Sequence, residues 1–133
     1  MATKYTCGEP YTEKGSKFFG FSAQVDNVMQ FNDMMAEIKK EHRKASHYCF
    51  AYNIHEKTLV GEDIKQKYSN DGEPSGCGNA LLTLLKSNNL ENHAIIVVRY
   101  FGGILLGSGN LIRAYSAAGK LALKSVADQI QSC

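Results

Sequence analysis

The sequence predicts a single α+β domain with two layers, a mixed four-stranded sheet that carries its helices mainly on one face. Its 133 residues, of which 44% are hydrophobic, are enough for one ordinary core and too few for two. Hydrophobic residues switch between strand and helix spacing in the order β-α-β-β-α-β-α. Two consecutive strands in the middle, with helices interleaved elsewhere, are typical of an α+β layer, and residues 1–133 are expected to form it as one domain.

The chain is expected to open with a strand and a helix. Aromatic and apolar residues at positions 19, 21, 23 and 25 give residues 16–25 the period of two that indicates a strand. Apolar residues then recur at helical spacing from Val28 to about Lys44, and Asp26 or Asn27 can cap the N-terminus of this helix.

The middle of the chain predicts two neighbouring strands. Residues 47–54 are rich in aromatic side chains, which indicates a strand. Residues 55–63 contain Gly61 and mixed polar residues, which favours a hairpin loop, and residues 64–68 can form a short strand at the sheet edge.

The last third predicts a helix, a buried strand and a second helix. Pro74 can begin a helix because its missing N–H would be unpaired there anyway, and this helix is expected to end near Asn88. Residues 94–101 are a continuous apolar run, typical of a central strand buried on both faces or nearly so. The glycine-rich turn of residues 102–109 then leads into a helix over about 111–127.

The glycine-rich turn is a candidate anion site. Glycines allow close backbone approach, and the N–H groups at a helix N-terminus can bind an anion such as phosphate. Two known motifs are incomplete, however, because Ser108 replaces the P-loop lysine and Ile112 the third glycine of the dinucleotide fingerprint. ATP hydrolysis and NAD binding are therefore disfavoured, and tight strand-to-helix packing explains the glycines equally well. The candidate residues are Arg99, Gly102, Gly103, Gly107, Gly109 and Arg113.

A turn with two carboxylates and a hydroxyl precedes the second helix. Asp71, Glu73 and Ser75 could support acid–base or nucleophilic chemistry. Ser75 lacks the glycine frame of a nucleophile elbow, and an Asp-Gly turn before a Pro-started helix explains most of the segment without catalysis. Pairing of Asp71 or Glu73 with Arg99 or Arg113 is favoured instead. Because no catalytic motif is complete, we expect no enzyme, with a small phosphate-ligand enzyme at this junction as an alternative.

Basic and aromatic residues interleave in a way that would suit single-stranded nucleic acid. The net charge of +2 excludes a strongly basic, histone-like protein but not a local basic patch. A solvated helix end explains the same basic run, and aromatic residues at a period of two also suit a sheet core. The candidate surface combines Arg99 and Arg113 with the end of the first helix, Lys39, Lys40, Arg43 and Lys44.

The cysteines and the apolar runs give expectations about metals and location. Cys7, Cys49, Cys77 and Cys133 are far apart and no histidine has zinc-finger spacing, so we expect free thiols rather than a metal site. No apolar run reaches the roughly 18 residues of a membrane span. The first residues lack the apolar stretch of a secretion signal. A cytoplasmic protein with no metal, cofactor or membrane contact is expected.

Several ordered motifs resemble the Impact family, which includes bacterial YigZ proteins and the eukaryotic Impact translation regulators. Asp71-Gly-Glu-Pro-Ser-Gly76 is followed by Val98-Arg-Tyr-Phe-Gly-Gly103, then by Leu106-Gly-Ser-Gly109 and Leu111-Ile-Arg-Ala-Tyr115. The opening also matches, with Lys14-Gly-Ser-Lys-Phe18, Ala45-Ser-His47 and Ala51-Tyr52. The resemblance covers about residues 12–124, so the chain looks like the central module of that family standing alone.

The resemblance implies both a fold and a function. The fold would be an α+β domain similar to the second domain of a small-subunit ribosomal protein. The function would be a non-enzymatic regulatory or binding module in translation control or the stress response, including starvation signalling, acting through a protein or ribosome-associated partner. Direct RNA or DNA binding is the first alternative. The expected binding surface is the junction of Asp71, Glu73 and Ser75 with Arg99, the glycines and Arg113.

Overall fold

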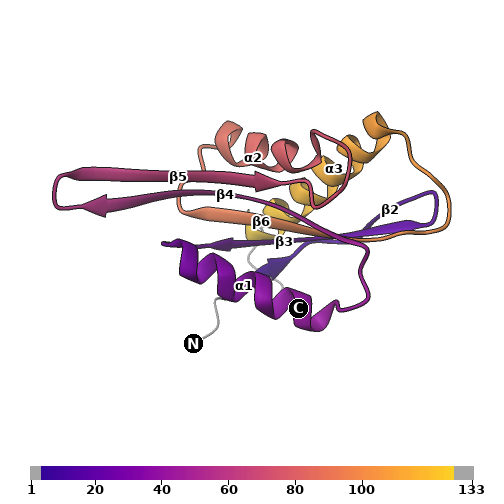
Figure 1. Cartoon of the computed structure of the whole chain (residues 1–133), viewed down its shortest axis with the longest axis horizontal. Helices are drawn as coiled ribbons and strands as arrows, with labels where there is room; N and C mark the ends of the chain where they lie inside the picture. Colours follow the sequence, from indigo (N-terminus) through magenta and orange to yellow (C-terminus); the bar gives the residue numbers. More distant parts are fainter. Residues whose placement is uncertain (1–3, 128–133) are drawn as a thin grey trace.

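The computed structural model describes residues 4–127, which form a six-stranded sheet with helices on both faces (Figure 1). The α+β class predicted from the sequence is confirmed. The elements along the chain are β1 (Thr6–Cys7), β2 (Tyr11–Glu13), β3 (Ser16–Gln24), α1 (Val28–Glu41), β4 (His47–Thr58), β5 (Gly61–Ser69), α2 (Cys77–Ser87), β6 (His93–Tyr100) and α3 (Ser108–Ala127).

The described strands of the sheet pair in antiparallel fashion in the order β1-β3-β6-β4-β5, with β2 paired to β3 beside this path. The prediction of a mixed four-stranded sheet is therefore wrong in strand number and in direction. β1 and β2 could not be predicted because they are only two and three residues long, too short to show a period of two. The relative direction of the strands could not be predicted because β3 and β6, which are distant in the sequence, pair directly.

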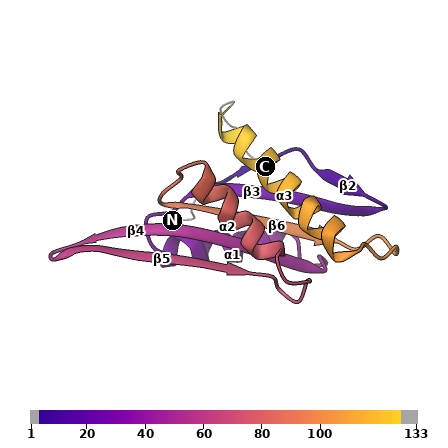
Figure 2. The same ribbon diagram turned by 90° about the horizontal axis from the view of Figure 1, so that it is seen from above.

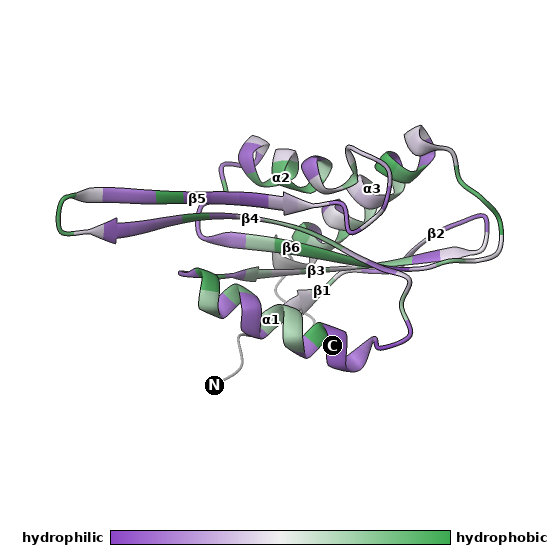
Figure 3. Cartoon of the chain, in the orientation of Figure 1, coloured by the Kyte–Doolittle hydropathy of each residue, from purple (hydrophilic) through white to green (hydrophobic). Residues whose placement is uncertain are grey.

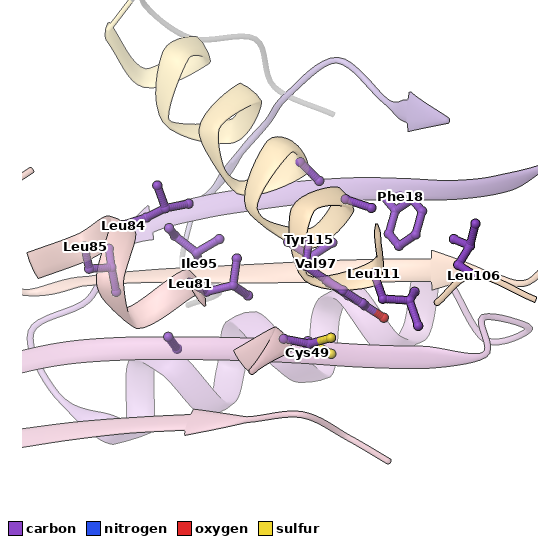
Figure 4. Close-up of a cluster of buried hydrophobic side chains, with 14 residues drawn as sticks. Phe18, Cys49, Leu81, Leu84, Leu85, Ile95, Val97, Leu106, Leu111 and Tyr115 are labelled. Atoms are coloured by element: carbon purple, nitrogen blue, oxygen red, sulfur yellow. The ribbon is translucent and has the colours of Figure 1, made fainter. Parts of the chain in front are cut away.

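Helices cover both faces of the sheet, so the molecule has three layers rather than the predicted two. α2 and α3 lie on one face, as predicted for most of the helices, and α1 lies on the other (Figures 1 and 2). The first core contains Ile95 and Tyr115 (Figure 4), and the second contains Phe31 and Ile96. β6 explains this arrangement, because Ala94–Val98 are all fully buried and point alternately into the two cores. The prediction of a central strand buried on both faces is confirmed.

The β4–β5 hairpin is longer than predicted and projects beyond the rest of the sheet (Figure 1). Thr58 pairs with Gly61, so residues 59–60 alone form the turn, and the predicted loop over residues 55–63 is wrong. The projecting arm, residues 55–65, contains no buried residue, so it lacks the alternation of apolar and polar residues by which a strand is predicted. The prediction that the third strand lies at the sheet edge is confirmed for β5.

The ends of α1 determine where the basic run lies. The Asn27 side chain accepts a hydrogen bond from the backbone N–H of Gln30 at 2.9 Å, which confirms one of the two predicted N-caps. The helix ends at Glu41, earlier than predicted, because the residue after it leaves helical geometry. Arg43 and Lys44 therefore lie in the turn that follows α1.

Three of the four cysteines lie in the described part of the chain. Cys49 and Cys77 are buried free thiols, as expected. Cys7 is disulfide-bonded, so the expectation of a free thiol is wrong there, and Cys133 lies outside the described residues. Within residues 4–127, no three side chains of metal-binding type are grouped closely enough to hold a metal ion. Over the same range, no helix has the length and apolar character needed to cross a membrane.

Candidate functional site

Most of the polar motif residues meet at one end of the sheet. Because β4 and β6 are antiparallel, the first residue of β4 lies beside the end of β6, and His47 pairs directly with Arg99. The turn of residues 70–76, between β5 and α2, is joined to both strands by the hydrogen bonds described below. We call this region, with the β6–α3 loop of residues 101–107, the loop end of the molecule.

A buried ion pair joins the 70–76 turn to β6. Nη1 of Arg99 donates hydrogen bonds to both carboxylate oxygens of Glu73, at 3.0 and 2.8 Å, and the two side chains are 6% and 4% exposed. Nη2 of Arg99 donates to Oγ of Ser16 at 3.3 Å. The predicted pairing of an acidic turn residue with an arginine is thus confirmed for Glu73 and Arg99. A pair so deeply buried is a strong constraint on the fold, since removing one partner leaves an uncompensated charge.

Tyr115 supplies a further hydrogen bond to the Glu73 carboxylate. It lies on α3 with no exposed surface, and its hydroxyl donates to Oε2 of Glu73. Burial raises the pKa of the Tyr115 hydroxyl, so the hydroxyl stays protonated and remains a donor. The side chain extends from α3 toward Cys49 on β4 (Figure 4). The Cys49 thiol donates to the carbonyl of Asn70 at 3.2 Å, and burial raises its pKa, so it is an unreactive core group.

His47 lies on the solvent side of this cluster. Its Nδ1 is 2.7 Å from the backbone carbonyl oxygen of Asp71, and its Nε2 is 3.5 Å from Oε1 of Glu73. Because a carbonyl oxygen only accepts, Nδ1 carries a proton. The Asp71 carboxylate accepts a hydrogen bond from the backbone N–H of Tyr48 at 2.6 Å. Asp71 thus attaches the turn to β4 and does not pair with either arginine.

Two of the predicted glycines occupy positions that the backbone geometry requires. A Cβ built on Gly102 would lie 2.1 Å from the carbonyl carbon of Gly15, so the β6–α3 loop and the β2–β3 turn touch through bare backbone. Gly103 has a φ of +87°, a left-handed conformation that favours glycine. Gly107 and Gly109 have room for a side chain. Close packing therefore explains Gly102, whereas Gly103 has open space around it and is favoured by its backbone conformation alone.

Several sequence candidates lie apart from the cluster. Ser75 is exposed in the turn, and Arg113 is exposed on α3, where its guanidinium donates to Asn110 of the same helix. The basic run lies at the end of α1, on the other face of the sheet from α3 (Figure 1). Arg99 is buried and paired. The predicted nucleic-acid surface that combines this run with Arg99 and Arg113 is therefore not formed.

Ser16, His47 and Tyr115 belong to the cluster although the sequence does not single them out as site residues. Ser16 Oγ accepts from Arg99 and also from the backbone N–H of Gly102, at 3.2 Å. Each of the three lies in a segment whose overall pattern indicates a strand or a helix. Their only sequence signal is that they fall inside the motifs that carry the family resemblance.

Apolar side chains are exposed on the β6–α3 loop next to the cluster. Phe101, Ile104 and Leu105 are 49%, 52% and 86% exposed, and this loop is among the hydrophobic segments of Figure 3. The Phe101 ring lies 5.5 Å from the Arg99 guanidinium, so the loop rests directly on the buried ion pair. We call residues 101–105 the apolar loop. Exposed apolar side chains gathered in this way are typical of a contact surface.

The family model of the Impact N-terminal domain matches residues 14–123. The chain belongs to this family. It is 43% identical over 102 residues to IMPACT family member YvyE of Bacillus subtilis, covering 75% of this chain and 44% of that protein. It is 35% identical over 119 residues to an IMPACT family member of Haemophilus influenzae, covering 89% of this chain and 56% of that protein. The chain therefore spans about half the length of the curated relatives it matches.

Two solved structures share the fold. One, described as a hypothetical protein, has a TM-score of 0.77 at 28% identity and covers 93% of this chain and 61% of that one. The other is the two-domain translational regulator Yih1, with a TM-score of 0.60 at 27% identity over 92% of this chain and 47% of that one. The family resemblance that the sequence motifs indicate is confirmed.

Proposed function

We propose that this chain is a non-enzymatic binding module in translation control, which acts through a protein or ribosome-associated partner. Its family membership and its similarity to the translational regulator Yih1 support the translational role. The observation that carries the proposal is the arrangement at the loop end, where the polar side chains bind one another and the apolar ones face outward. On this proposal the protein works in the cytoplasm, where translation takes place.

The buried state of Glu73 favours a binding module over an enzyme. A general acid or base must reach the proton it transfers, whereas Glu73 is 4% exposed, both of its oxygens accept from Arg99, and Oε2 also accepts from Tyr115. A surface pocket between the start of α1 and the hairpin arm contains none of the candidate residues. It is lined by Asp26, Asn27, His55, Glu56, Lys57 and Asn92.

The apolar loop is the part of the loop end that a partner would contact. Leu105 exposes most of its side chain and Ile104 about half. The Phe101 ring, in the same loop, contacts Arg99 of the cluster. Asp71 and His47 supply a polar rim at the adjoining turn and strand. An apolar centre with a polar rim is the common composition of protein interfaces.

Sedimentation and translation in a cell-free extract test this function. The tagged chain is added to bacterial and to yeast translation extracts, and both reporter yield and the fraction of the chain that sediments with ribosomes are measured. We expect the wild-type chain to change the yield and Leu105→Asp to lose most of the effect. Leu59→Asp is the matched control, because Leu59 is also a highly exposed leucine but lies in the hairpin turn. The proposal fails if the wild-type chain has no effect in either extract, or if Leu105→Asp acts like wild type.

Nucleic-acid binding at the end of α1 is a second candidate, supported by one observation. Lys39, Lys40, Arg43 and Lys44 are all exposed, and Nζ of Lys39 lies 5.3 Å from the centre of the Tyr48 ring. Binding to a fluorescent single-stranded RNA and to a matched duplex should weaken steeply with salt if phosphates are contacted. The double variant Lys40→Glu/Arg43→Glu should lose this binding, and equal affinity in the variant would reject the surface.

A further inference from the structure

The outer edge of β5 is open. Among residues 4–127, β5 pairs with β4 alone and forms the end of the sheet. Seven of its nine residues are exposed. An exposed edge strand offers a row of backbone N–H and C=O groups to another strand, so its side chains decide which strand fits.

The charges of β5 are self-complementary about Ile64. Asp63 precedes Ile64 and Lys65 follows it. If two copies of β5 pair antiparallel with Ile64 opposite itself, Asp63 of each copy lies opposite Lys65 of the other. Directly opposite residues of antiparallel strands share a face and are close enough to interact, so this register makes two attractive pairs.

The same register brings exposed apolar side chains together. Ile64 is 54% exposed and would face itself across the strand pair. Four residues away on either side lie Val60, which is 97% exposed, and Tyr68, which is 45% exposed. Tyr68 lies on the same face as Ile64, whereas Val60 lies in the hairpin turn, so the turn of each copy would come close to Tyr68 of the other. The remaining opposite pairs, Gly61 with Lys67 and Glu62 with Gln66, contain no like charges.

Neighbouring registers lack this match. Centring the pair on Asp63 or on Lys65 places two like charges opposite each other. Shifting the register of the two strands by a single residue reverses which face of one strand meets the other, and it places Ile64 opposite Asp63 or Lys65. The register centred on Ile64 therefore combines charge attraction and apolar contact in a way its neighbours do not.

The helices do not obstruct this pairing. The start of α2 lies over Ser69, because a Cβ built on Gly78 would be 2.4 Å from the Ser69 carbonyl oxygen. Ser69 is at the end of β5 away from the hairpin turn, and the hairpin projects beyond α2 (Figures 1 and 2). Antiparallel pairing would place the two α2 helices at opposite ends of the strand pair.

We propose that two copies of this chain form a symmetric dimer by antiparallel pairing of their β5 edges, centred on Ile64. The two sheets then continue as one, and the interface is isologous, as is usual for two-fold dimers. The interface is centred on Ile64, and the apolar loop lies at the other end of the molecule from the hairpin turn (Figure 1).

A charge-exchange series tests the register. Sedimentation velocity of the purified chain over a wide concentration range should show the mass rise from 14.7 kDa toward twice that value. Asp63→Lys and Lys65→Asp should each weaken dimerisation by about tenfold or more, because each places like charges opposite one another twice. The double variant should regain the dimer, and a mixture of the two single variants should form a heterodimer. Lys120→Asp, an exposed change on α3, is the control and should dimerise like wild type.

A cysteine series tests the same geometry independently. In Ile64→Cys the two new thiols lie directly opposite each other, so mild oxidation should cross-link the dimer quickly. Gln66→Cys alone should not cross-link, whereas a mixture of Glu62→Cys and Gln66→Cys should. Circular dichroism shows whether each variant is folded. A wild-type chain that stays monomeric at every concentration overturns the proposal, and so does a Gln66→Cys chain that cross-links as fast as Ile64→Cys.

Discussion

Replacing Glu73 by glutamine isolates the charge of the buried cluster. The amide keeps the shape of the side chain, but it leaves the Arg99 guanidinium, which is 6% exposed, without its counter-charge. Removing one partner of a buried ion pair costs about 3–5 kcal/mol, which is a large part of the roughly 5–15 kcal/mol that stabilises an ordinary domain. We expect Glu73→Gln to lower the free energy of unfolding by this amount.

The pair as a whole should be worth much less than the loss of either partner suggests. Among the described residues, Nε of Arg99 is a buried polar atom with no hydrogen-bond partner, so the desolvation of this guanidinium is not fully compensated. The double variant Glu73→Gln/Arg99→Met removes both charges and should recover at least about 1 kcal/mol relative to Glu73→Gln alone.

Urea unfolding followed by circular dichroism measures both effects at neutral pH. For Glu73→Gln the midpoint should fall by more than about 1 M. Glu91→Gln is the control, because Glu91 is 64% exposed, and it should change the free energy by less than about 0.5 kcal/mol. The electrostatic reasoning is refuted if Glu73→Gln costs no more than this control, or if the double variant loses the sum of the two single losses.

Three further predictions concern single groups. Gly102→Ala should lower the melting temperature by several degrees because its Cβ would meet the backbone of the β2–β3 turn, whereas Gly107→Ala should be near neutral; equal effects in the two would contradict the steric argument. Cys77, whose pKa burial raises to about 11, should react with a thiol reagent at pH 8 only after unfolding, as mass spectrometry would show, and rapid labelling of the native protein would contradict this. Burial lowers the pKa of His93, so below about pH 6.5 the unfolded state binds more protons than the folded state, and stability should fall as the pH drops. The urea midpoint of His93→Gln should fall less over the same pH range, and an equal fall in the variant would contradict this.

The elements that bury one clear face could be predicted from the sequence, and those made by distant contacts could not. β3 and α1 show their periods, β4 is rich in aromatic residues and β6 is a continuous apolar run, and the motifs carry enough order to indicate the family. β1 and β2 exist through pairing with β3, and the hairpin arm has no buried face. The burial of β6 on both faces requires that both faces of the sheet be covered, but the sequence does not show that α1 is the helix that covers the second face.

The candidate site shows the same division. The sequence predicts that Asp71 or Glu73 pairs with an arginine, and the structure selects Glu73 with Arg99. That choice depends on the 70–76 turn lying beside the end of β6, a contact between segments about 26 positions apart. Tyr115 and Ser16 join from α3 and β3 for the same reason. Periodicity within each segment carries no information about such meetings.

The cluster and the apolar loop are coupled, and this determines how binding experiments are interpreted. Phe101 rests on the Arg99 guanidinium, and its backbone N–H donates to Oγ of Ser46 at 3.1 Å, while the N–H of Ser46 donates to the Arg99 carbonyl at 2.8 Å. We therefore expect a change at Glu73 or Arg99 to displace the loop even if a partner never touches those side chains. Loss of binding in Glu73→Gln would not identify a contact residue. Loss of binding in Leu105→Asp at unchanged stability would identify one, because Leu105 is 86% exposed and supports no part of the core.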